Sequence, residues 1–500
     1  MRYAKTDYIS AVRLVILLYW VKGTFRTGCQ RERAGVNTNL STDFRRGARR
    51  YSLPSSHGTM LGRSVVFLPT IDDFMSQQSA RISRRRFLAN GVLAMASPLV
   101  LSSRVLGREG VLPPSEKIVI ALIGYGNEGG SIRPFFTTRD DAAKNNYQMV
   151  AICDCNKAQV DRGVRDVNRD YGNSDCKGYH KYEELLERLD IDAIAIATPD
   201  HWHTKIAVEA CKAGKDVFCE KPLTLTPAES RKIVAAARRY NRVCSSGSQR
   251  VMQDYGYMAP VIQSGALGEV KEAFFEVGPP PDDAYYPQEP IPAGLDWDRW
   301  LGPAPWVPYH PERCSGNYGG GWRRYGDYGN GFLADWGAHK FAAVTYVLGI
   351  DHLEPLELLP PQCEQNPHNR LSLVFAGGTR IHHVLPGSGH DITFIGSENE
   401  YRHNNDRNRI RPIRQVDVRR YNGNAPHLYA DFAYCVRHRL RPFQDFFYGA
   451  VAATCLQLTH ITYKVNRPLK WDADNTAFVN DEQANRWVSR PKRSPYEING

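Results

Sequence analysis

Residues 118–129 read Ile-Val-Ile-Ala-Leu-Ile-Gly-Tyr-Gly-Asn-Glu-Gly, an apolar run that ends in three spaced glycines. The run is typical of a buried parallel strand that leads into a glycine-rich turn and a helix. The first glycine allows a tight bend, the second lets a phosphate approach the backbone, and the third lets the helix pack closely. Free N–H groups at a helix start attract anions. We predict a pyrophosphate cradle formed by Gly124, Tyr125, Gly126, Asn127 and Gly129.

A second apolar run ends in an acidic residue, Asp154, which lies 25 residues after Gly129. In dinucleotide-binding folds a carboxylate near this position accepts a hydrogen bond from the adenosine ribose. It also repels the 2′-phosphate of NADP, so Asp154 favours NAD. Lys157 is the nearest cation and leaves NADP possible. The glycines alone could be a chance turn, but the strand and the acid at the expected spacing favour the cradle.

Short apolar runs alternate with helical stretches between residues 116 and 246, which predicts a doubly wound parallel sheet of the Rossmann type. The expected strands are Lys117–Ile123, Tyr147–Cys153, Ile191–Ala197, Lys215–Cys219 and Arg242–Ser246. The expected helices between them are Glu183–Leu189, Thr204–Ala213 and Pro227–Tyr240. This block has the size of one domain.

The pattern changes in residues 247–470, where strand-like runs follow one another with few helices. The expected strands are Val270–Val277, Leu353–Leu359, Leu371–Phe375, Thr379–Leu385 and Asp391–Ile395. They predict an α+β domain with a large, open, mainly antiparallel sheet. We expect residues 471–500 to form a polar tail on the surface.

An insertion at residues 278–331 is rich in Pro, Gly, Tyr and Trp. It is long for a connection without structure, which is typical of a functional loop, and its aromatic content argues against disorder. Two interpretations remain open for its large side chains. They either stack on sugar rings or form a satellite hydrophobic cluster; the residues concerned are Trp297, Trp300, Trp322 and Tyr325.

The net charge of +11 is concentrated at the N-terminus. Residues 1–110 contain 18 Lys and Arg against 6 Asp and Glu, whereas the remainder contains 46 against 47. The globular part is therefore nearly neutral, which argues against a nucleic-acid-binding surface.

The N-terminal segment contains Ser83-Arg84-Arg85-Arg86-Phe87-Leu88, followed by a weakly apolar stretch. This resembles a twin-arginine export signal within residues 75–110, and the alternative is a basic amphipathic helix. Residues 1–74 show no periodic pattern, and we expect them to be disordered or a spurious leader, with Met75 as the true start. The apolar patch at 9–21 is too short for a stable membrane span. We therefore expect a periplasmic or otherwise exported protein.

The 11 cysteines include no C-x-x-C pair and no zinc-type spacing with histidine. Most lie in apolar runs, such as Cys211, Cys244 and Cys455, and we interpret them as buried thiols. We predict no metal site.

Three further motifs follow the cradle along the chain. Residues 197–203 (Ala-Thr-Pro-Asp-His-Trp-His) and Glu220-Lys221-Pro222 each follow a predicted strand, where cofactors lie in such sheets. Asp335 and His339 are spaced i, i+4, which puts a carboxylate and an imidazole on one helix face. A histidine near neutral pKa suits proton abstraction from an alcohol. The alternative is a structural ion pair or a core histidine.

Together, the cradle, Glu220-Lys221-Pro222 and Asp335-x-x-x-His339 resemble the Gfo/Idh/MocA oxidoreductases, whose members include glucose-fructose oxidoreductase and inositol dehydrogenase. The resemblance covers roughly residues 116–470. It implies hydride transfer between a sugar carbon and a nicotinamide cofactor, and a homo-oligomer. It also implies roles for matched residues. The cradle glycines would bind pyrophosphate, Asp154 would bind the adenosine ribose, and Thr198, Pro199 and His203 would lie along the nicotinamide side. Glu220 would also bind the cofactor, and Lys221 would contact the substrate hydroxyl and the nicotinamide ribose. His339 would be the general base, with Asp335 hydrogen-bonded to the substrate or to His339.

This sequence also departs from the family. Many relatives have His-Phe-Asp where this chain has Lys340-Phe341-Ala342. The loss of a carboxylate at 342 removes one possible contact, and Lys340 either suits an acidic sugar or faces solvent. The function we expect is an NAD(P)-dependent oxidoreductase acting on a sugar, polyol or sugar derivative. The alternatives are a glycoside-cleaving enzyme that oxidises its sugar transiently, and a cofactor-binding protein without catalysis.

Overall fold

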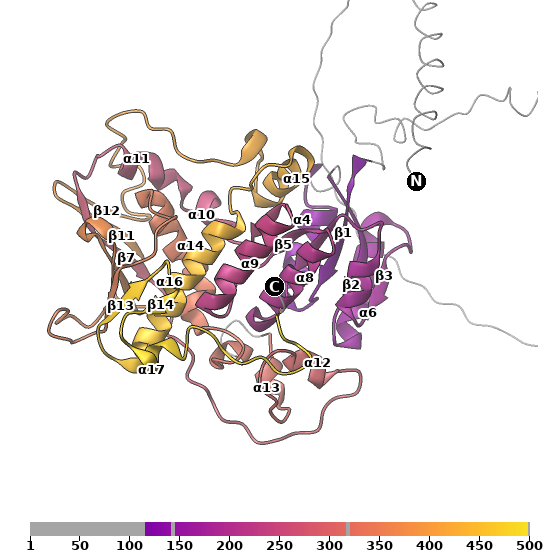
Figure 1. The fold of residues 1–500 in the computed structure, drawn as a ribbon. Helices are drawn as coiled ribbons and strands as arrows, with labels where there is room; N and C mark the ends of the chain where they lie inside the picture. The colour runs from indigo at the N-terminus through magenta and orange to yellow at the C-terminus, as the bar shows by residue number, and fades with distance from the viewer. Residues whose placement is uncertain (1–115, 142–145, 317–320, 499–500) are drawn as a thin grey trace, which may run out of the picture. The chain divides into compact units, whose positions relative to one another are not determined.

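The computed structural model describes residues 116–141, 146–316 and 321–498. The expected leader and the twin-arginine motif, residues 1–110, lie outside the described residues. The described part contains two sheets joined by long helices (Figure 1).

The first sheet confirms the predicted Rossmann-type architecture. All its strands are parallel, in the order β3-β2-β1-β4-β5-β6. The strands are β1 (Ile118–Ile123), β2 (Tyr147–Cys153), β3 (Lys177–Tyr179), β4 (Ala193–Ile196), β5 (Asp216–Cys219) and β6 (Cys244–Ser246). Only the short edge strand β3 was not predicted. Its three residues are mostly exposed and carry no apolar pattern.

Helices cover both faces of this sheet, as its alternating side chains require. Ala121 and Ile123 of β1 pack with α8 and α9, whereas Ile120 and Leu122 pack with α4, α6 and α15. The helices are α3 (Asn127–Ile132), α4 (Pro134–Thr137), α6 (Lys157–Tyr171), α7 (Tyr182–Glu187), α8 (Asp200–Lys212), α9 (Pro227–Arg239) and α15 (Leu428–His438).

The register of the sheet places several chain segments side by side. Ile123, the last residue of β1, is paired with Cys153 of β2 and with Ile196 of β4. The segments that follow these strands therefore begin next to one another at one edge. This edge carries the candidate site.

The second sheet confirms the mainly antiparallel prediction, with one parallel pair between β7 and β10. Its order is β12-β11-β7-β10-β9-β8-β13-β14. The strands are β7 (Val270–Glu276), β8 (Glu357–Leu359), β9 (Leu371–Val374), β10 (Arg380–Val384), β11 (Ile392–Gly396), β12 (Glu400–Arg402), β13 (Leu469–Asp472) and β14 (Ala477–Phe478).

The expectation of few helices after residue 250 was wrong. Two long helices, α14 (Gly331–Leu348) and α16 (Phe446–Val465), pack on each other, and α16 also packs on α9 of the first domain (Figure 1). Both helices are buried on most sides. Helix α16 carries no polar stripe that would mark it in the sequence, and α14 was expected only as the helical turn that holds Asp335 and His339. Shorter helices are α10 (Arg250–Gln253), α11 (Ala259–Gln263) and α17 (Glu482–Asn485), with 3₁₀ turns η3 (Gly256–Met258), η5 (Ala376–Gly378) and η6 (Asn422–Asn424).

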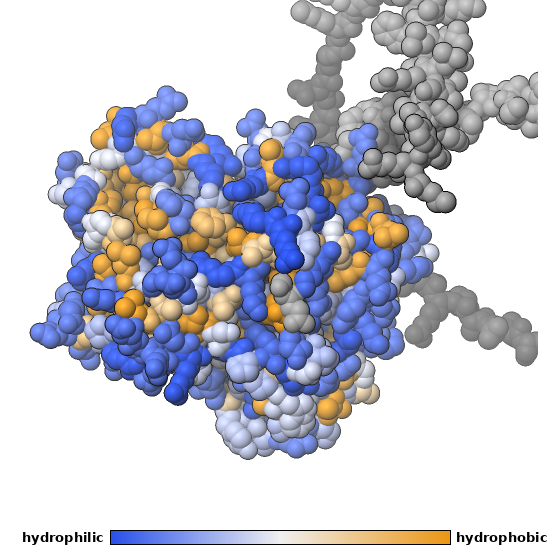
Figure 2. Space-filling view, in the orientation of Figure 1, coloured by the Kyte–Doolittle hydropathy of each residue, from blue (hydrophilic) through white to orange (hydrophobic). Residues whose placement is uncertain are grey.

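The aromatic insertion contains α12 (Trp297–Leu301), α13 (Pro311–Cys314) and η4 (Gly321–Arg324). Its large side chains form a buried satellite cluster, as one of the two interpretations proposed; the members include Trp297, Trp300, Trp322 and Tyr325. The surface over α12 and α13 is pale in the hydropathy view, which reflects its aromatic, Gly and Pro content (Figure 2).

The segment 471–500 is more than a surface tail. Trp471 and Phe478 are buried in the core of the second domain, and Tyr496 and Ile498 pack into the core of the first. Among the described residues, no helix has the length and apolar character needed to cross a bilayer. The ten cysteines of this part are free, and Cys211, Cys244 and Cys455 are buried thiols as predicted.

Candidate active site

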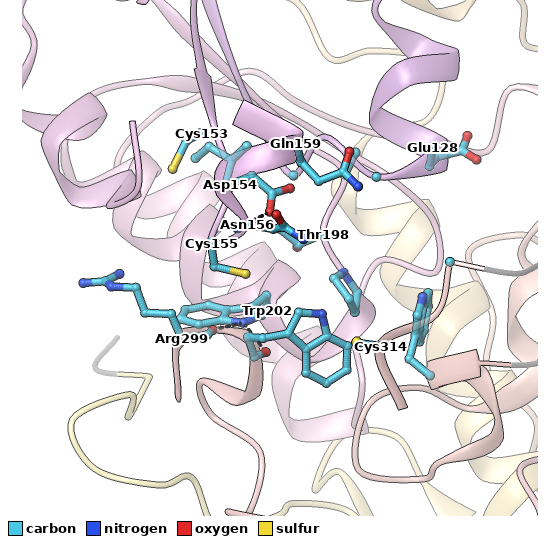
Figure 3. Close-up of a pocket in the computed structure, with 18 of the residues that line it drawn as sticks. Glu128, Cys153, Asp154, Cys155, Asn156, Gln159, Thr198, Trp202, Arg299 and Cys314 are labelled. Atoms are coloured by element: carbon cyan, nitrogen blue, oxygen red, sulfur yellow. Dashed lines mark hydrogen bonds between the residues drawn. The ribbon is translucent and has the colours of Figure 1, made fainter. Parts of the chain in front are cut away.

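A pocket of about 290 Å³ lies at the carboxyl ends of β1, β2, β4 and β5. One side is formed by the first domain, with Gly124, Gly126, Asn127, Asp154, Thr198, Pro199, Glu220 and Lys221. The other side is formed by the aromatic insertion, with Leu295, Arg299, Trp300, Tyr309, Trp322 and Arg323. Figure 3 shows Asp154, Asn156 and Thr198 close together, with Cys155 between them and Arg299. Most of the residues predicted from the sequence to bind a cofactor therefore line one cavity.

The glycine turn has the geometry of a phosphate cradle. Gly124 has a φ of +88°, and a Cβ there would lie 2.6 Å from the carbonyl oxygen of Ala197. At Gly129 a Cβ would lie 2.1 Å from the carbonyl oxygen of Gly124. At Gly126, by contrast, a Cβ would meet nothing within 4 Å. The outer glycines are thus required by packing, whereas Gly126 keeps open the space that a pyrophosphate would fill.

Asp154 lines the pocket and also fixes the glycine turn. Its Oδ2 accepts a hydrogen bond of 2.7 Å from the backbone N–H of Tyr125, and its Oδ1 accepts one of 2.8 Å from that of Asn156. Burial raises the pKa of Asp154, while these two bonds oppose the rise. The carboxylate therefore joins the ends of β1 and β2 and remains beside the space expected for a ribose.

Two other cradle residues have different orientations. The Tyr125 ring is buried, and its hydroxyl donates to Asp166 at 2.9 Å, so only its backbone serves the turn. The side chain of Asn127 lines the pocket and donates to the carbonyl oxygen of Gly316 at 2.7 Å. Asn127 thereby connects the cradle to the aromatic insertion.

The 197–203 motif is divided between the pocket and the wall behind it. Thr198 and Pro199 line the pocket, and the Thr198 hydroxyl is buried without a hydrogen-bond partner among the described residues. His203 does not line it. Its two ring nitrogens lie 2.8 Å from the carbonyl oxygens of Thr198 and Pro222. His203 therefore braces the two loops that follow β4 and β5.

Lys221 and Asp335 form a buried ion pair at the edge of the pocket. The Lys221 Nζ donates to the Asp335 Oδ1 at 2.7 Å, and their side chains are 9% and 4% exposed. Burial would lower the pKa of Lys221, but the charges of Asp335 and Glu220 outweigh it and raise that pKa. Burial would likewise raise the pKa of Asp335, but Lys221 and Arg323 hold it below its ordinary value. Both groups are therefore charged at neutral pH.

Asp335 and His339 lie one turn apart on α14, which confirms the predicted helix. The hydrogen bonds of the Asp335 carboxylate go to Lys221 and Arg323 rather than to His339, one of the partners that we had expected. Burial and then the charge of Lys221 lower the pKa of His339 well below its ordinary value. Its Nδ1 is buried without a hydrogen-bond partner in the described structure. His339 is thus a neutral imidazole at ordinary pH, and its pKa lies below the near-neutral value that we expected of the base from the sequence.

Two further buried carboxyl groups belong to this end of the pocket. Burial raises the pKa of both Glu220 and Asp200 well above the ordinary range. The Glu220 Oε1 has no hydrogen-bond partner among the described residues. Lys221, Asp335 and Arg323 act electrostatically on Asp200. Asp200 was quoted in the sequence motif but given no role.

Sequence reasoning missed two arginines of the insertion. Arg323 lies with its Nε 3.1 Å from the Asp335 Oδ2, and Arg299, which lines the pocket, pairs with Glu183 at 3.1 Å. Neither occurs in a recognisable motif, and only the folded insertion brings them to the site. Lys340, in contrast, pairs with Asp391 at 2.5 Å and with the carbonyl of Glu276, so it neither faces solvent nor lines the pocket.

The insertion forms hydrogen bonds with the first domain at several points around the pocket. The backbone N–H of Lys157 donates to the carbonyl of Gly294 at 2.8 Å, and that of Asp296 donates to Cys155 at 3.0 Å. The indole N–H of Trp202 donates to the carbonyl of Trp300 at 3.1 Å. Within residues 116–141, 146–316 and 321–498, no cluster of three or more His, Cys, Asp or Glu side chains could hold a metal ion.

Two family models match this chain. Residues 118–248 match the NAD-binding Rossmann fold of an oxidoreductase family, and residues 281–498 match the C-terminal alpha/beta domain of the same family. The chain belongs to the Gfo/Idh/MocA oxidoreductase family. The first match covers the parallel sheet and the second covers the second sheet except β7. Together the two matches include every residue of the pocket.

Curated relatives match this chain over a shorter region than the two family models do. An alpha-N-acetylgalactosaminidase of Shewanella oneidensis is 29% identical over 173 residues, which are 32% of this chain and 35% of that protein. A glycosyl hydrolase family 109 protein of Shewanella sp. strain ANA-3 is 32% identical over 151 residues, 30% of this chain and 32% of that protein. The match thus spans about a third of these relatives.

A solved structure matches over a greater length. An NAD-binding protein from Listeria innocua is 18% identical and has a TM-score of 0.50. The match covers 71% of this chain and 97% of that protein. At this level of identity the likeness concerns the fold.

Proposed function

We propose that this protein is an NAD(P)-dependent oxidoreductase that acts on a CH–OH group of a sugar, polyol or sugar derivative. The observation that carries the proposal is Lys221, which lines the glycine-cradle pocket and is paired with the buried Asp335. Asp335 and the neutral His339, one helical turn along α14, do not themselves line the pocket. A structural ion pair alone would not require an adjacent buried imidazole whose Nδ1 has no hydrogen-bond partner in the described part of the chain, nor an open cradle at Gly126.

Each group of residues has a separate role in the proposed reaction. A nicotinamide cofactor, held by the cradle, Asp154, Thr198 and Pro199, supplies the hydride acceptor or donor. The Lys221 ammonium donates a hydrogen bond to the substrate hydroxyl oxygen and stabilises negative charge that develops there. His339, which is neutral, accepts the hydroxyl proton during oxidation and returns it during reduction. Asp335 orients the Lys221 ammonium.

NAD is the preferred cofactor in this proposal. Asp154 lies in the pocket with a carboxylate that repels a 2′-phosphate. Arg299 also lines the pocket, but its guanidinium is paired with Glu183. A comparison of the dissociation constants of NAD and NADP by tryptophan fluorescence tests this preference. A tighter complex with NADP would contradict it.

The test of the activity is a panel of sugars, polyols, sugar acids and glycosides, assayed for reduction of added NAD or NADP. We expect reduction with at least one compound that carries a secondary hydroxyl. The His339→Ala variant should lower kcat by about a hundredfold or more with that compound. Lys271→Ala, at an exposed lysine of β7, is the matched control and should keep full activity. Undiminished turnover in His339→Ala would contradict the proposal.

A second candidate is glycoside cleavage through transient oxidation of the sugar. It is favoured by the names of the curated relatives, an alpha-N-acetylgalactosaminidase and a glycosyl hydrolase family 109 protein. Both candidates use the same pocket and the same proton-transfer groups. Release of a sugar from a glycoside without net formation of NADH would favour this second candidate.

Two further proposals concern the protein in the cell. Paired arginines before Phe87-Leu88 support export through the twin-arginine route, in which the protein crosses the membrane folded with its cofactor. N-terminal sequencing of the native protein tests this and the proposed start at Met75. The large open sheet supports a dimer or tetramer, which light scattering of the purified protein tests.

A further inference from the structure

The aromatic insertion delivers a second cation to the central carboxylate of the site. The Asp335 Oδ1 lies 2.7 Å from the Lys221 Nζ, and its Oδ2 lies 3.1 Å from the Arg323 Nε. All three side chains are less than 10% exposed. Lys221 follows β5, Asp335 lies on α14, and Arg323 belongs to η4, so three distant segments meet at one carboxylate.

Arg323 is held in place by the insertion. Its guanidinium lies over the indole ring of Trp322, with the Cζ 4.3 Å from the ring centroid. Trp322 is itself buried in the satellite cluster with Trp300 and Tyr325. A planar guanidinium that stacks on a buried ring has few rotamers available, so it fixes the group that it contacts.

A carboxylate held from one side only could rotate toward the substrate space or toward His339. Lys221 donates to Oδ1, and Arg323 lies against both oxygens, with its Nη2 3.5 Å from Oδ1 and its Nε 3.1 Å from Oδ2. The Asp335 carboxylate therefore has a defined orientation. Breaking one partner of a buried charged group is costly, because the remaining charge is then poorly compensated. Arginine suits this position since its planar guanidinium presents several N–H donors in a fixed geometry.

We propose that Arg323 is a positioning residue for the reaction: it fixes the orientation of Asp335, and through Asp335 it sets the position and proton affinity of the Lys221 ammonium. This inference rests on the proposed function, because it assigns Lys221 to the substrate hydroxyl. It also gives the aromatic insertion a role in the chemistry in addition to forming a wall of the pocket.

The first test is a double-mutant cycle on kcat, with Arg323→Gln, Asp335→Asn and the double variant. We expect Arg323→Gln to lower kcat by about tenfold or more while KM changes by less than about threefold. In the Asp335→Asn background the same substitution should lower kcat by less than about threefold, because Arg323 acts through Asp335. Arg323→Lys, which keeps the charge, should restore part of the lost kcat.

Arg324→Gln is the matched control. Arg324 is the next residue of η4, is 40% exposed and pairs with Asp282 on the surface. It should leave kcat unchanged. Full activity of Arg323→Gln would overturn the proposal. Equal losses in the wild-type and Asp335→Asn backgrounds would also overturn it, and would indicate that Arg323 contacts the substrate directly.

A second test needs no turnover and so separates this inference from the proposed function. The charges of Asp335, Glu220 and Glu128 raise the pKa of Lys221. Lys221 in turn lowers the pKa of His339 and of Asp200. Removing the Arg323 charge leaves Asp335 to Lys221 alone, so the amine should hold its proton more tightly. In competitive acetylation read by mass spectrometry, Lys221 should react about tenfold more slowly in Arg323→Gln, relative to the exposed Lys157.

The two tests have distinct outcomes. A merely structural role of Arg323 would loosen the pocket and make Lys221 react faster, which would overturn the proposal. An unchanged rate of acetylation would overturn it as well. If the wild-type protein turns over no compound but Lys221 reacts more slowly in Arg323→Gln than in Arg324→Gln, the positioning role stands and the proposed function fails.

Discussion

The first domain and the aromatic insertion line opposite sides of one pocket, yet the sequence encodes them in different ways. The first domain uses repeated local signals, in which an apolar strand is followed by a glycine or a polar group. The insertion has no such signal, and its residues reach the pocket only because Trp297, Trp300 and Trp322 form a separate buried cluster. The glycine cradle and Lys221 can therefore be predicted from local sequence, whereas the wall that the aromatic insertion forms depends on tertiary packing.

The largest expected effect lies on the first-domain side. Lys221→Ala should lower kcat by about a hundredfold or more, since it removes the group proposed to contact the substrate hydroxyl. The variant should still bind the cofactor, because the cradle is unchanged. Steady-state kinetics together with a fluorescence titration of NAD measure both properties. Wild-type kcat in Lys221→Ala would contradict the role of the amine.

The next effect contrasts two glycines of one turn. Gly129→Ala should destabilise the protein by about 1–3 kcal/mol, because its Cβ would lie 2.1 Å from the Gly124 carbonyl oxygen. Gly126→Ala should unfold at the wild-type temperature, since a Cβ there meets nothing within 4 Å. It should nevertheless weaken cofactor binding by about tenfold, because the methyl group enters the phosphate space. Thermal melts and titrations separate the two effects, and equal melting temperatures of both variants would refute the assigned geometry.

A smaller effect is expected on the insertion side. Arg299 is 20% exposed and pairs with Glu183, so it joins the insertion to α7 beside the pocket. Arg299→Ala should raise the rate of cofactor dissociation by about fivefold at most, as is usual for a partly exposed pair. Stopped-flow displacement measures this rate. Arg409→Ala, at an exposed arginine paired with Asp406, is the control and should dissociate at the wild-type rate.

The smallest effect concerns pH. Burial and Lys221 hold the pKa of His339 well below 6.5, so the base stays neutral as the pH falls through that value. Activity that requires neutral His339 is lost only when the pH falls below the depressed pKa. We therefore expect little change in kcat/KM between about pH 8 and pH 6.5. A pH–rate profile whose acid limb is centred at or above 6.5 would contradict the proposed base.

Much of the first domain could be predicted from local pattern. The run Tyr147–Cys153 has the predicted bounds, and β1 begins one residue later than expected. The edge strand β3 was not predicted, because it buries little apolar surface. Helix α16 was not predicted, because it is apolar on nearly every side and its sequence therefore shows no polar face with a 3.6-residue period.

The site was predictable where a residue directly follows a strand or shares a helix turn with its partner. Lys221 and Asp154 follow strands, and Asp335 and His339 share a turn of α14. Arg323 could not be found in this way, because its contact with Asp335 depends on the path of the insertion. The structure also puts His203 between two backbone carbonyls, a brace that no spacing in the sequence indicates.

The most direct test of the central claim is the nucleotide content of the native protein. The purified protein is denatured, and any nicotinamide nucleotide released is identified and counted before and after incubation with the panel of sugars and glycosides. We expect NAD, either bound on purification or taken up stoichiometrically, that becomes NADH with a sugar or remains NAD while a glycoside is cleaved. A protein that neither carries nor takes up a nicotinamide nucleotide would contradict the account.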